Sequence, residues 1–170
     1  MIRMTEALNS ILCTCGTLPV RRVDIREARG LVLAEQAAAG QDIPPFDKAA
    51  MDGYAVRSED LRRGGSLRET GSIQAGEAPG TPLRPGACMR IMTGAPVPAG
   101  ADAVVMIERT EVSPGGVVFR KPVHPGDNIC PRGEDLRSGE RVLGPGTVLG
   151  AAEIAILASA GLGGASVYSV

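Results

Sequence analysis

The sequence predicts an α+β fold with mostly β content, and three observations support this class. Glycine (23 residues) and proline (13 residues) are abundant in a chain of 170, and they separate short apolar runs in the way that turns separate strands. Only two segments, one near each end of the chain, carry the apolar periodicity of a helix. The length is sufficient for one sizeable domain or two small ones.

The first expected elements are a helix and a strand. Apolar residues recur at helical spacing over residues 4–15, and Gly16 is a typical helix stop; the stripe consists of Met4, Leu8, Ile11, Leu12 and Cys15. Residues 19–25 alternate as a strand, and residues 31–34 form a second extended piece. Pro44 and Pro45 then interrupt regular structure, because proline lacks an N–H group. We therefore place a domain boundary near them.

Residues 46–127 are expected to be mostly β. Ala55 and Val56 end a short strand, and residues 58–61 form one capped helical turn. The continuous apolar run 103–107 is typical of a strand buried on both faces. The turn at residues 113–116 predicts a hairpin that joins this run to residues 117–120.

The last expected elements are a helix over 151–160 and a strand over 165–170. Glu153 favours the positive end of the helix dipole, and Gly161 ends the helix. The chain stops inside the last strand, so we expect it to be the front part of something longer.

Composition argues against nucleic acids and membranes as partners. Two Phe, two Tyr and no Trp cannot build a row of stacking faces, and a net charge of −1 gives no field that attracts phosphate backbones. The longest apolar segment, 148–163, contains Glu153 and is too short to span a bilayer, and the N-terminus lacks a signal-peptide core. We expect a soluble, cytoplasmic protein.

The cysteines give no metal-binding pattern. Cys13, Cys15, Cys88 and Cys130 contain no CxxC pair, and His124 is the only histidine, so neither a zinc site of the usual spacing nor a His-based metalloenzyme is expected. We interpret the four as reduced thiols and His124 as an incidental surface residue.

Two loops each combine a polar side chain with a glycine. In the first, Asp52 precedes Gly53, where the backbone can bend and let a ligand approach closely. In the second, a strand runs into Thr93 and Gly94, whose hydroxyl and free N–H could hold an oxyanion or phosphate. An ordinary turn explains either loop equally well.

A third loop carries adjacent acids. Glu134 and Asp135 follow a glycine and are suited to a hard cation such as Mg²⁺, although a solvated acidic turn is the alternative. Arg132 could supply the opposite charge, and Glu77 and Glu108 are further carboxylates.

At these loops the sequence resembles the N-terminal half of the molybdopterin molybdenumtransferase family, the MoeA family that includes the gephyrin E domain. The matching strings, in family order, are DIPPFDKAAMDGYAV (42–56), AGEAPG (75–80), RIMTGAPVPAGADAVVMIE (90–108), PGDNICPRGEDLRSGE (125–140) and LGAAEIAILASAGL (149–162). Residues 1–41 resemble the family only in their helix and strand pattern.

The resemblance implies a transferase of molybdenum cofactor biosynthesis. Such an enzyme inserts molybdenum from molybdate into adenylylated molybdopterin with Mg²⁺ and releases AMP, and it is a homodimer whose active site is shared between subunits. Asp52, Thr93 and Asp135 match catalytic positions of the family, with Asp52 and Asp135 as metal ligands. Gly53, Gly94, Arg132 and Glu134 are the expected cofactor-binding neighbours, and we expect the three catalytic residues to meet at one solvent-facing rim.

We therefore expect two parts. Residues 1–43 and 138–170 form a discontinuous helix-and-strand domain of a dimerisation type, into which a β-rich domain of residues 44–137 is inserted. The family continues beyond this length into a large α/β domain, so this chain is expected to form one wall of the active site and to be inactive alone. Two alternatives remain open: a non-catalytic dimerisation or scaffold module of the same family, and a Mg²⁺-dependent phosphohydrolase that uses Asp52 and Asp135.

Overall fold

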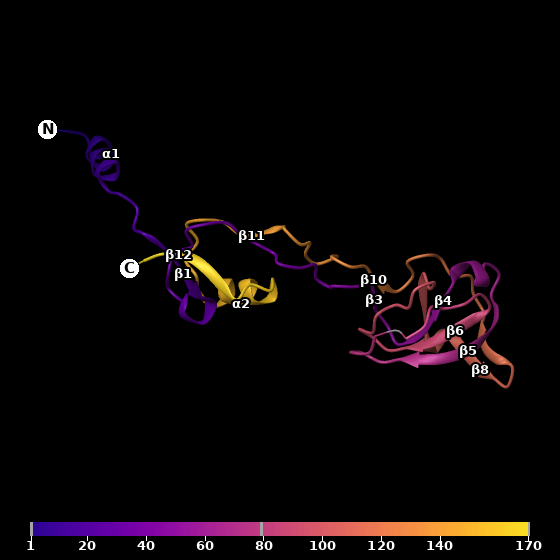
Figure 1. Cartoon of the computed structure of the whole chain (residues 1–170). Coiled ribbons are helices and arrows are strands. Elements are labelled where there is room, and N and C mark those ends of the chain that lie inside the picture. The colour runs from indigo at the N-terminus through magenta and orange to yellow at the C-terminus, as the bar shows by residue number, and fades with distance from the viewer. Residues whose placement is uncertain (1, 79, 170) are drawn as a thin grey trace. The chain divides into compact units, whose positions relative to one another are not determined.

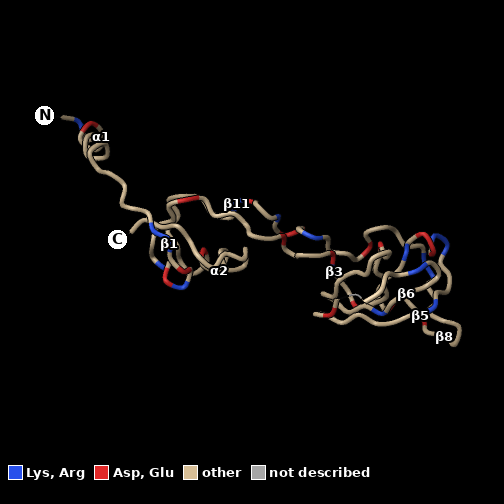
Figure 2. Tube along the Cα trace, viewed as in Figure 1, with Lys and Arg blue, Asp and Glu red and all other residues tan. Residues whose placement is uncertain are grey.

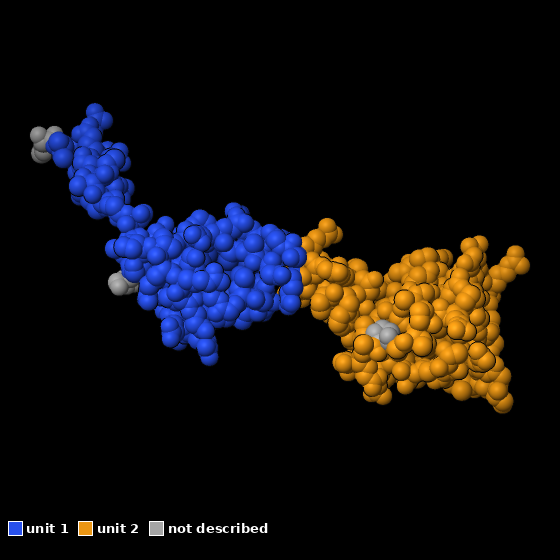
Figure 3. Space-filling model, in the orientation of Figure 1, with its two compact units in different colours: residues 1–41, 138–170 blue, residues 42–137 orange. Residues whose placement is uncertain are grey.

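The computed structural model describes residues 2–78 and 80–169, which divide into two compact units (Figure 3). Unit 1 comprises residues 1–41 and 138–170, and unit 2 comprises residues 42–137. Within these described residues most elements are strands and two are α-helices (Figure 1), which confirms the predicted mostly-β α+β class. Among the described residues, no helix is long and apolar enough to cross a membrane.

Within its described residues, unit 1 contains two antiparallel strand pairs. Its elements are α1 (Met4–Thr14), β1 (Val20–Asp24), the 3₁₀ turn η1 (Ile25–Glu27), β2 (Ala37–Ala38), β11 (Arg141–Leu143), α2 (Ala151–Ser159) and β12 (Gly164–Tyr168). β1 pairs with β12, and β2 pairs with β11. The buried core consists of Val23, Ala28, Leu33, Leu149, Leu157, Ala165 and Val167. Residues from both ends of the chain are thus needed to complete this unit.

The predicted first helix is confirmed as α1, but its apolar stripe is not buried. Met4 is 85% exposed and Leu12 is 61% exposed, and no residue of α1 is buried. The helix ends as expected before Gly16, because Cys15 leaves the helical region with φ −80° and ψ 120°.

Unit 2 contains a six-stranded sheet in the order β7-β4-β6-β5-β9-β8. The strands are β4 (Gly53–Val56), β5 (Gly65–Ile73), β6 (Ala87–Ile91), β7 (Ala103–Met106), β8 (Thr110–Ser113) and β9 (Gly116–Phe119). β5 and β6 are parallel, and all other neighbours in this sheet are antiparallel. The unit also contains β3 (Lys48–Ala49) and β10 (Ile129–Cys130), which pair with each other, and the 3₁₀ turns η2 (Ser58–Leu61) and η3 (Ile107–Arg109).

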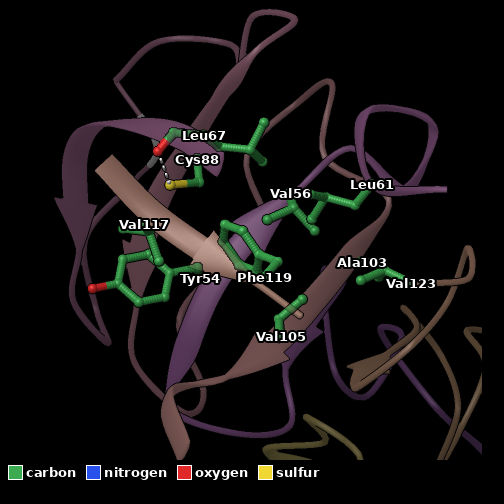
Figure 4. Packing of buried hydrophobic residues seen from close by; sticks show 10 residues of the cluster. All are labelled: Tyr54, Val56, Leu61, Leu67, Cys88, Ala103, Val105, Val117, Phe119 and Val123. Atoms are coloured by element: carbon green, nitrogen blue, oxygen red, sulfur yellow. Dashed lines mark hydrogen bonds between the residues drawn. The ribbon is translucent and has the colours of Figure 1, made fainter. Parts of the chain in front are cut away.

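Each face of this sheet carries a buried hydrophobic cluster. One cluster gathers Tyr54, Phe119, Val105 and their neighbours (Figure 4), with the rings of Tyr54 and Phe119 edge to face at 6.1 Å. The other cluster includes Ala55, Ile91 and Val104. Because Val104 and Val105 belong to different clusters, the prediction of burial on both faces is confirmed for the strand itself. Ile107, the last residue of the predicted run, lies outside the strand on η3 and is exposed.

Several local expectations are wrong. The hairpin at residues 113–116 joins β8 to β9, because η3 turns the chain after β7 and a separate strand follows. Residues 31–34, by contrast, are extended as expected, with antiparallel bridges from Val32 to Val148 and from Leu33 to Val167. Ser58 does not cap η2 from its N-terminus: its N–H and hydroxyl donate to Asp102 instead. The last strand, β12, ends at Tyr168. Val170, the end of the predicted strand, and Pro79, in the family-like string 75–80, lie outside the described residues.

The outer edge of β7 is covered by a loop. The Val104 N–H donates to the Asp127 carbonyl at 2.8 Å, and the Asn128 side-chain amide donates to the Val104 carbonyl at 2.8 Å. Asn128 reaches this position with a φ of 53°, a conformation that asparagine tolerates better than most residues.

Candidate functional site

The segment from Ile43 to Ala50 holds the third loop in place on one side. Ile43 pairs with Leu136, Lys48 and Ala49 pair with Cys130 and Ile129, and the Ala50 N–H donates to the Asn128 carbonyl at 2.9 Å. These contacts form an antiparallel ladder in which β3 lies beside β10 (Figure 1).

The other side of the same segment holds the Thr93–Gly94 loop. The Ala49 N–H donates to the Ala95 carbonyl at 2.9 Å, and the Val97 N–H donates to the Asp47 carbonyl at 2.9 Å. The segment therefore lies between the second and third loops, and all three polar loops are joined through main-chain hydrogen bonds.

Asp52 and Thr93, 41 residues apart in sequence, are in direct contact. Asp52 Oδ1 accepts two hydrogen bonds of 2.6 Å, one from the Thr93 N–H and one from the Thr93 hydroxyl. Both residues are exposed. Two donors on a single oxygen fix the carboxylate orientation, while no described residue donates to Oδ2, which leaves that oxygen available to a ligand.

The same contact keeps Asp52 ionised. The side-chain and main-chain hydrogen bonds from Thr93 lower the pKa of Asp52 below its ordinary value, with a smaller contribution from the positive charge of Arg90. The site thus presents a fixed negative charge to solvent. Figure 2 shows basic and acidic residues interspersed along the Cα trace.

The structure gives Gly53 a packing role. A Cβ on Gly53 would lie 1.9 Å from the Val105 carbonyl oxygen, so only glycine allows β4 to approach β7 this closely. Asp52 therefore leads directly into a closely packed strand pair of the sheet.

The expectation of a free N–H at Gly94 is wrong. This amide donates to the Ala49 carbonyl at 2.8 Å, because it helps to hold the loop against β3. The Thr93 hydroxyl likewise donates to Asp52, so it can only accept a hydrogen bond from a ligand. Thr93 and Gly94 therefore offer an incoming ligand a hydrogen-bond acceptor, and they do not provide the donors that an oxyanion-binding site needs.

Asp135 is held at the other end of the ladder. Its N–H donates to the Ile43 carbonyl at 2.9 Å, its side chain is exposed, and among the described residues this carboxylate makes no hydrogen bond to Asp52 or Thr93. The structure thus brings two of the three expected catalytic residues together and anchors the third separately.

Arg132 and Glu134 already have protein partners. The Arg132 guanidinium forms an ion pair with Asp42, and the Arg132 main-chain N–H donates to the Asp47 carboxylate at 2.7 Å. A hydrogen bond with Glu134 raises the pKa of the Cys130 thiol. Glu77 accepts from the Gln74 N–H at 3.0 Å, as a turn residue does, and Glu108 is exposed on η3.

Arg90 and Tyr54 are neighbours of the site that sequence reasoning did not select. They lie directly opposite each other on β6 and β4, with the Arg90 Cζ 5.4 Å from the centre of the Tyr54 ring. Strand alternation could have found Tyr54, which follows Asp52 by two residues, whereas no local pattern singles out Arg90.

The donor set does not form a complete protein cage for a metal. Within residues 2–78 and 80–169, no three His, Cys, Asp or Glu side chains group closely enough to hold an ion. Mg²⁺ usually keeps several waters and takes one or two carboxylates together with substrate phosphates. One free oxygen on an ionised Asp52 fits that second mode.

A β unit inserted into a helix-and-strand unit, with an oriented acid at an exposed loop, defines a two-unit protein with a surface acidic site. The comparisons identify its family. The MoeA N-terminal region (domain I and II) matches residues 2–161, so the chain belongs to the MoeA family, as the resemblance implied.

Known relatives and solved structures agree with this assignment. A molybdopterin molybdenumtransferase 2 of Mycobacterium tuberculosis is 40% identical over 82% of this chain, and the molybdopterin molybdenumtransferase of Synechococcus elongatus is 33% identical over 99%. A crystal structure of a molybdopterin biosynthesis MoeA protein from Pyrococcus horikoshii has a TM-score of 0.92 and 32% identity over 99% of this chain. The chain spans 36% and 44% of the two relatives and 44% of that structure, less than half of each.

Proposed function

We propose that this chain supplies the N-terminal part of a molybdopterin molybdenumtransferase, which inserts molybdenum from molybdate into adenylylated molybdopterin in molybdenum cofactor biosynthesis. The observation that carries the proposal is the Asp52–Thr93 pair, which lies within the family-matched region and presents an oriented, ionised carboxylate. Relatives that bear this activity in their names match most of the chain.

The chain's own residues have distinct roles in this proposal. Thr93 positions Asp52 and keeps it ionised, and the free Oδ2 of Asp52 is the ligand for Mg²⁺. When bound, the ion offsets negative charge on the substrate and polarises the phosphoanhydride. Thr93 is a positioning residue, because its donors are directed at Asp52.

Asp135 is the second carboxylate of the proposal. Its main chain is fixed to Ile43, so its exposed side chain is held on the same loop that carries Arg132 and Glu134. We propose that this loop contacts a different part of the substrate from Asp52, since the two carboxylates belong to opposite ends of the ladder.

The chain is proposed to form one wall of a site shared across a homodimer, with the other contacts supplied by an α/β domain of the longer protein. The exposed apolar stripe of α1 is consistent with assembly. All four cysteines are free thiols, as expected for the proposed cytoplasmic location.

A chimera tests this function. This chain replaces the matching 44% of the Synechococcus protein, and AMP release from adenylylated molybdopterin is measured with molybdate and Mg²⁺. The unsubstituted chimera should be active, whereas Asp52→Asn and Asp135→Asn should each abolish release, and this chain alone should show none.

Glu108→Gln, an exposed acid outside the proposed site, is the matched control and should keep full activity. The circular dichroism spectrum of each chimera checks that it is folded. A folded chimera without activity, or normal turnover in both aspartate variants, would refute the proposed function.

A further inference from the structure

Arg90 differs from the paired arginines of unit 2. Arg57 and Arg62 contact Glu59, Arg120 contacts Glu111, and Arg132 contacts Asp42. Among the described residues, Arg90 has no carboxylate partner; its guanidinium lies over an aromatic ring instead. Its positive charge is therefore not neutralised by a contacting acid.

The guanidinium is held by the sheet. Tyr54 is buried in the cluster of Figure 4, where its hydroxyl points away from the other side chains. Arg90, opposite on β6, packs against this ring at 5.4 Å. A cation on an aromatic face loses part of its freedom before any ligand arrives, so the entropic cost of ordering it on binding is reduced.

One nitrogen of Arg90 lacks an acceptor. Nη1 is buried, and no hydrogen-bond partner for it lies among the described residues. A buried donor without a partner is unfavourable and is uncommon in native structures, where such groups are often found at functional sites. The arginine therefore retains one hydrogen-bond donor that no described residue satisfies.

Arg90 also belongs to the Asp52–Thr93 site by position. Tyr54↔Arg90 and Gly53↔Ile91 are successive pairs of the β4–β6 ladder, and the Thr93–Asp52 hydrogen bonds continue this contact beyond Ile91. Strand alternation places Asp52, Tyr54 and Arg90 on one face. A lone carboxylate repels an anion, and a guanidinium beside it offsets that repulsion.

We propose that Arg90 is the anion-binding residue of this site and takes oxygens of a phosphoanhydride. The inference rests on the proposed function for the class of ligand. A guanidinium presents parallel N–H donors that match two phosphate oxygens, which an ammonium group cannot do in the same geometry. Asp52 would then bind the metal ion, and Arg90 would bind the phosphate oxygens of the substrate.

The test uses the whole 170-residue chain and inorganic pyrophosphate without Mg²⁺. The backbone amide of Thr93 is followed by NMR, because it is bonded to Asp52 and remains in every variant. The unsubstituted chain should show a saturable shift at millimolar pyrophosphate. Arg90→Met should weaken the apparent affinity by roughly tenfold or more, and Arg90→Lys should fall between the two.

Arg68→Met is the matched control, since Arg68 is an exposed arginine of the neighbouring strand β5. It should bind as the unsubstituted chain does. The amide spectrum of β4 and β6 checks the fold of each variant. If Arg90→Met proves misfolded, the comparison of folded Arg90→Lys with Arg68→Met decides.

Three results would overturn the assignment: no shift in the unsubstituted chain, equal affinity in a folded Arg90→Met, or equal weakening by Arg68→Met. Binding is measured here without turnover. Pyrophosphate binding that depends on Arg90, together with an inactive folded chimera, would therefore refute the proposed function and leave the anion site standing.

Discussion

Replacing Gly53 with alanine tests the packing that supports Asp52. The new Cβ would lie 1.9 Å from the Val105 carbonyl oxygen, 2.7 Å from the Val105 carbonyl carbon and 3.1 Å from the Met106 Cα. All three are main-chain atoms, so no side-chain rotation relieves the clash. β4 must move away from β7.

The size of the effect follows from these distances. Reaching an ordinary contact of 3.4 Å from 1.9 Å requires a shift of about 1.5 Å, which lengthens the hydrogen bonds of the β4–β7 pairs beyond their useful range. Overpacking of a core costs about 1–3 kcal/mol, and each lost hydrogen bond adds about 1 kcal/mol. We expect Gly53→Ala to lower the free energy of unfolding of unit 2 by at least about 3 kcal/mol, a large part of a typical total.

The assay is urea unfolding followed by tyrosine emission. The chain has two tyrosines and no tryptophan, with Tyr54 in unit 2 and Tyr168 in unit 1. In a Tyr168→Phe background, the emission of buried Tyr54 therefore reports unit 2 alone. Gly71→Ala is the matched control, because a Cβ there meets no atom within 4 Å.

A Gly53→Ala variant that unfolds within about 0.5 kcal/mol of the parent would contradict the close approach. Equal destabilisation by Gly71→Ala would show instead that loss of any strand glycine is responsible.

Three further predictions concern other parts of the molecule. Thr93→Val removes one of two donors to Asp52 and should raise the pKa of that carboxyl toward its ordinary 3.8, as measured by carboxylate NMR titration. Because the pKa of Asp52 is lowered in the folded state, the stabilisation from this contact is fully present above pH 3.8 and is lost as pH falls through the folded-state pKa. An unchanged pKa of Asp52 in Thr93→Val would refute this prediction. Glu134→Gln should speed the reaction of Cys130 with a disulfide reagent in a Cys13→Ser, Cys15→Ser background, since Glu134 raises the pKa of Cys130, whereas Cys88, whose pKa burial raises to about 12, should react only after unfolding. Leu157→Ala, at the fully buried residue of α2, should cost about 2–5 kcal/mol in unit 1 as followed by Tyr168 emission, while the exposed Ile156→Ala should cost far less.

Strongly periodic or continuously apolar segments were predictable from sequence. The α1 spacing, the alternation of β1 and the apolar run of β7 each follow from local residue order. The hairpin was misassigned because the turn at 113–116 indicates that two strands meet there but not which strand precedes the turn. The preceding 3₁₀ turn, η3, has three residues and is too short to give a periodic signal that would separate β7 from β8.

The candidate site was predictable only in part. Asp52 and Thr93 were selected by motif, and the resemblance placed them together, but their hydrogen bonds depend on a contact across 41 residues that no local pattern encodes. The engagement of the Gly94 amide has the same origin, since its acceptor at Ala49 is 45 positions away. Arg90 was overlooked because a single arginine in a strand carries no motif.

The loop that covers β7 also bears on how the chain behaves while it folds and at high concentration. An uncovered outer strand invites a foreign chain to add itself, which is a common first step toward aggregation. Here Asp127 and Asn128 already satisfy the Val104 main-chain groups, so an intruding strand would first have to displace them. Asp127 and Asn128, which begin the loop that leads to Asp135, therefore also protect unit 2 from self-association along the β7 edge.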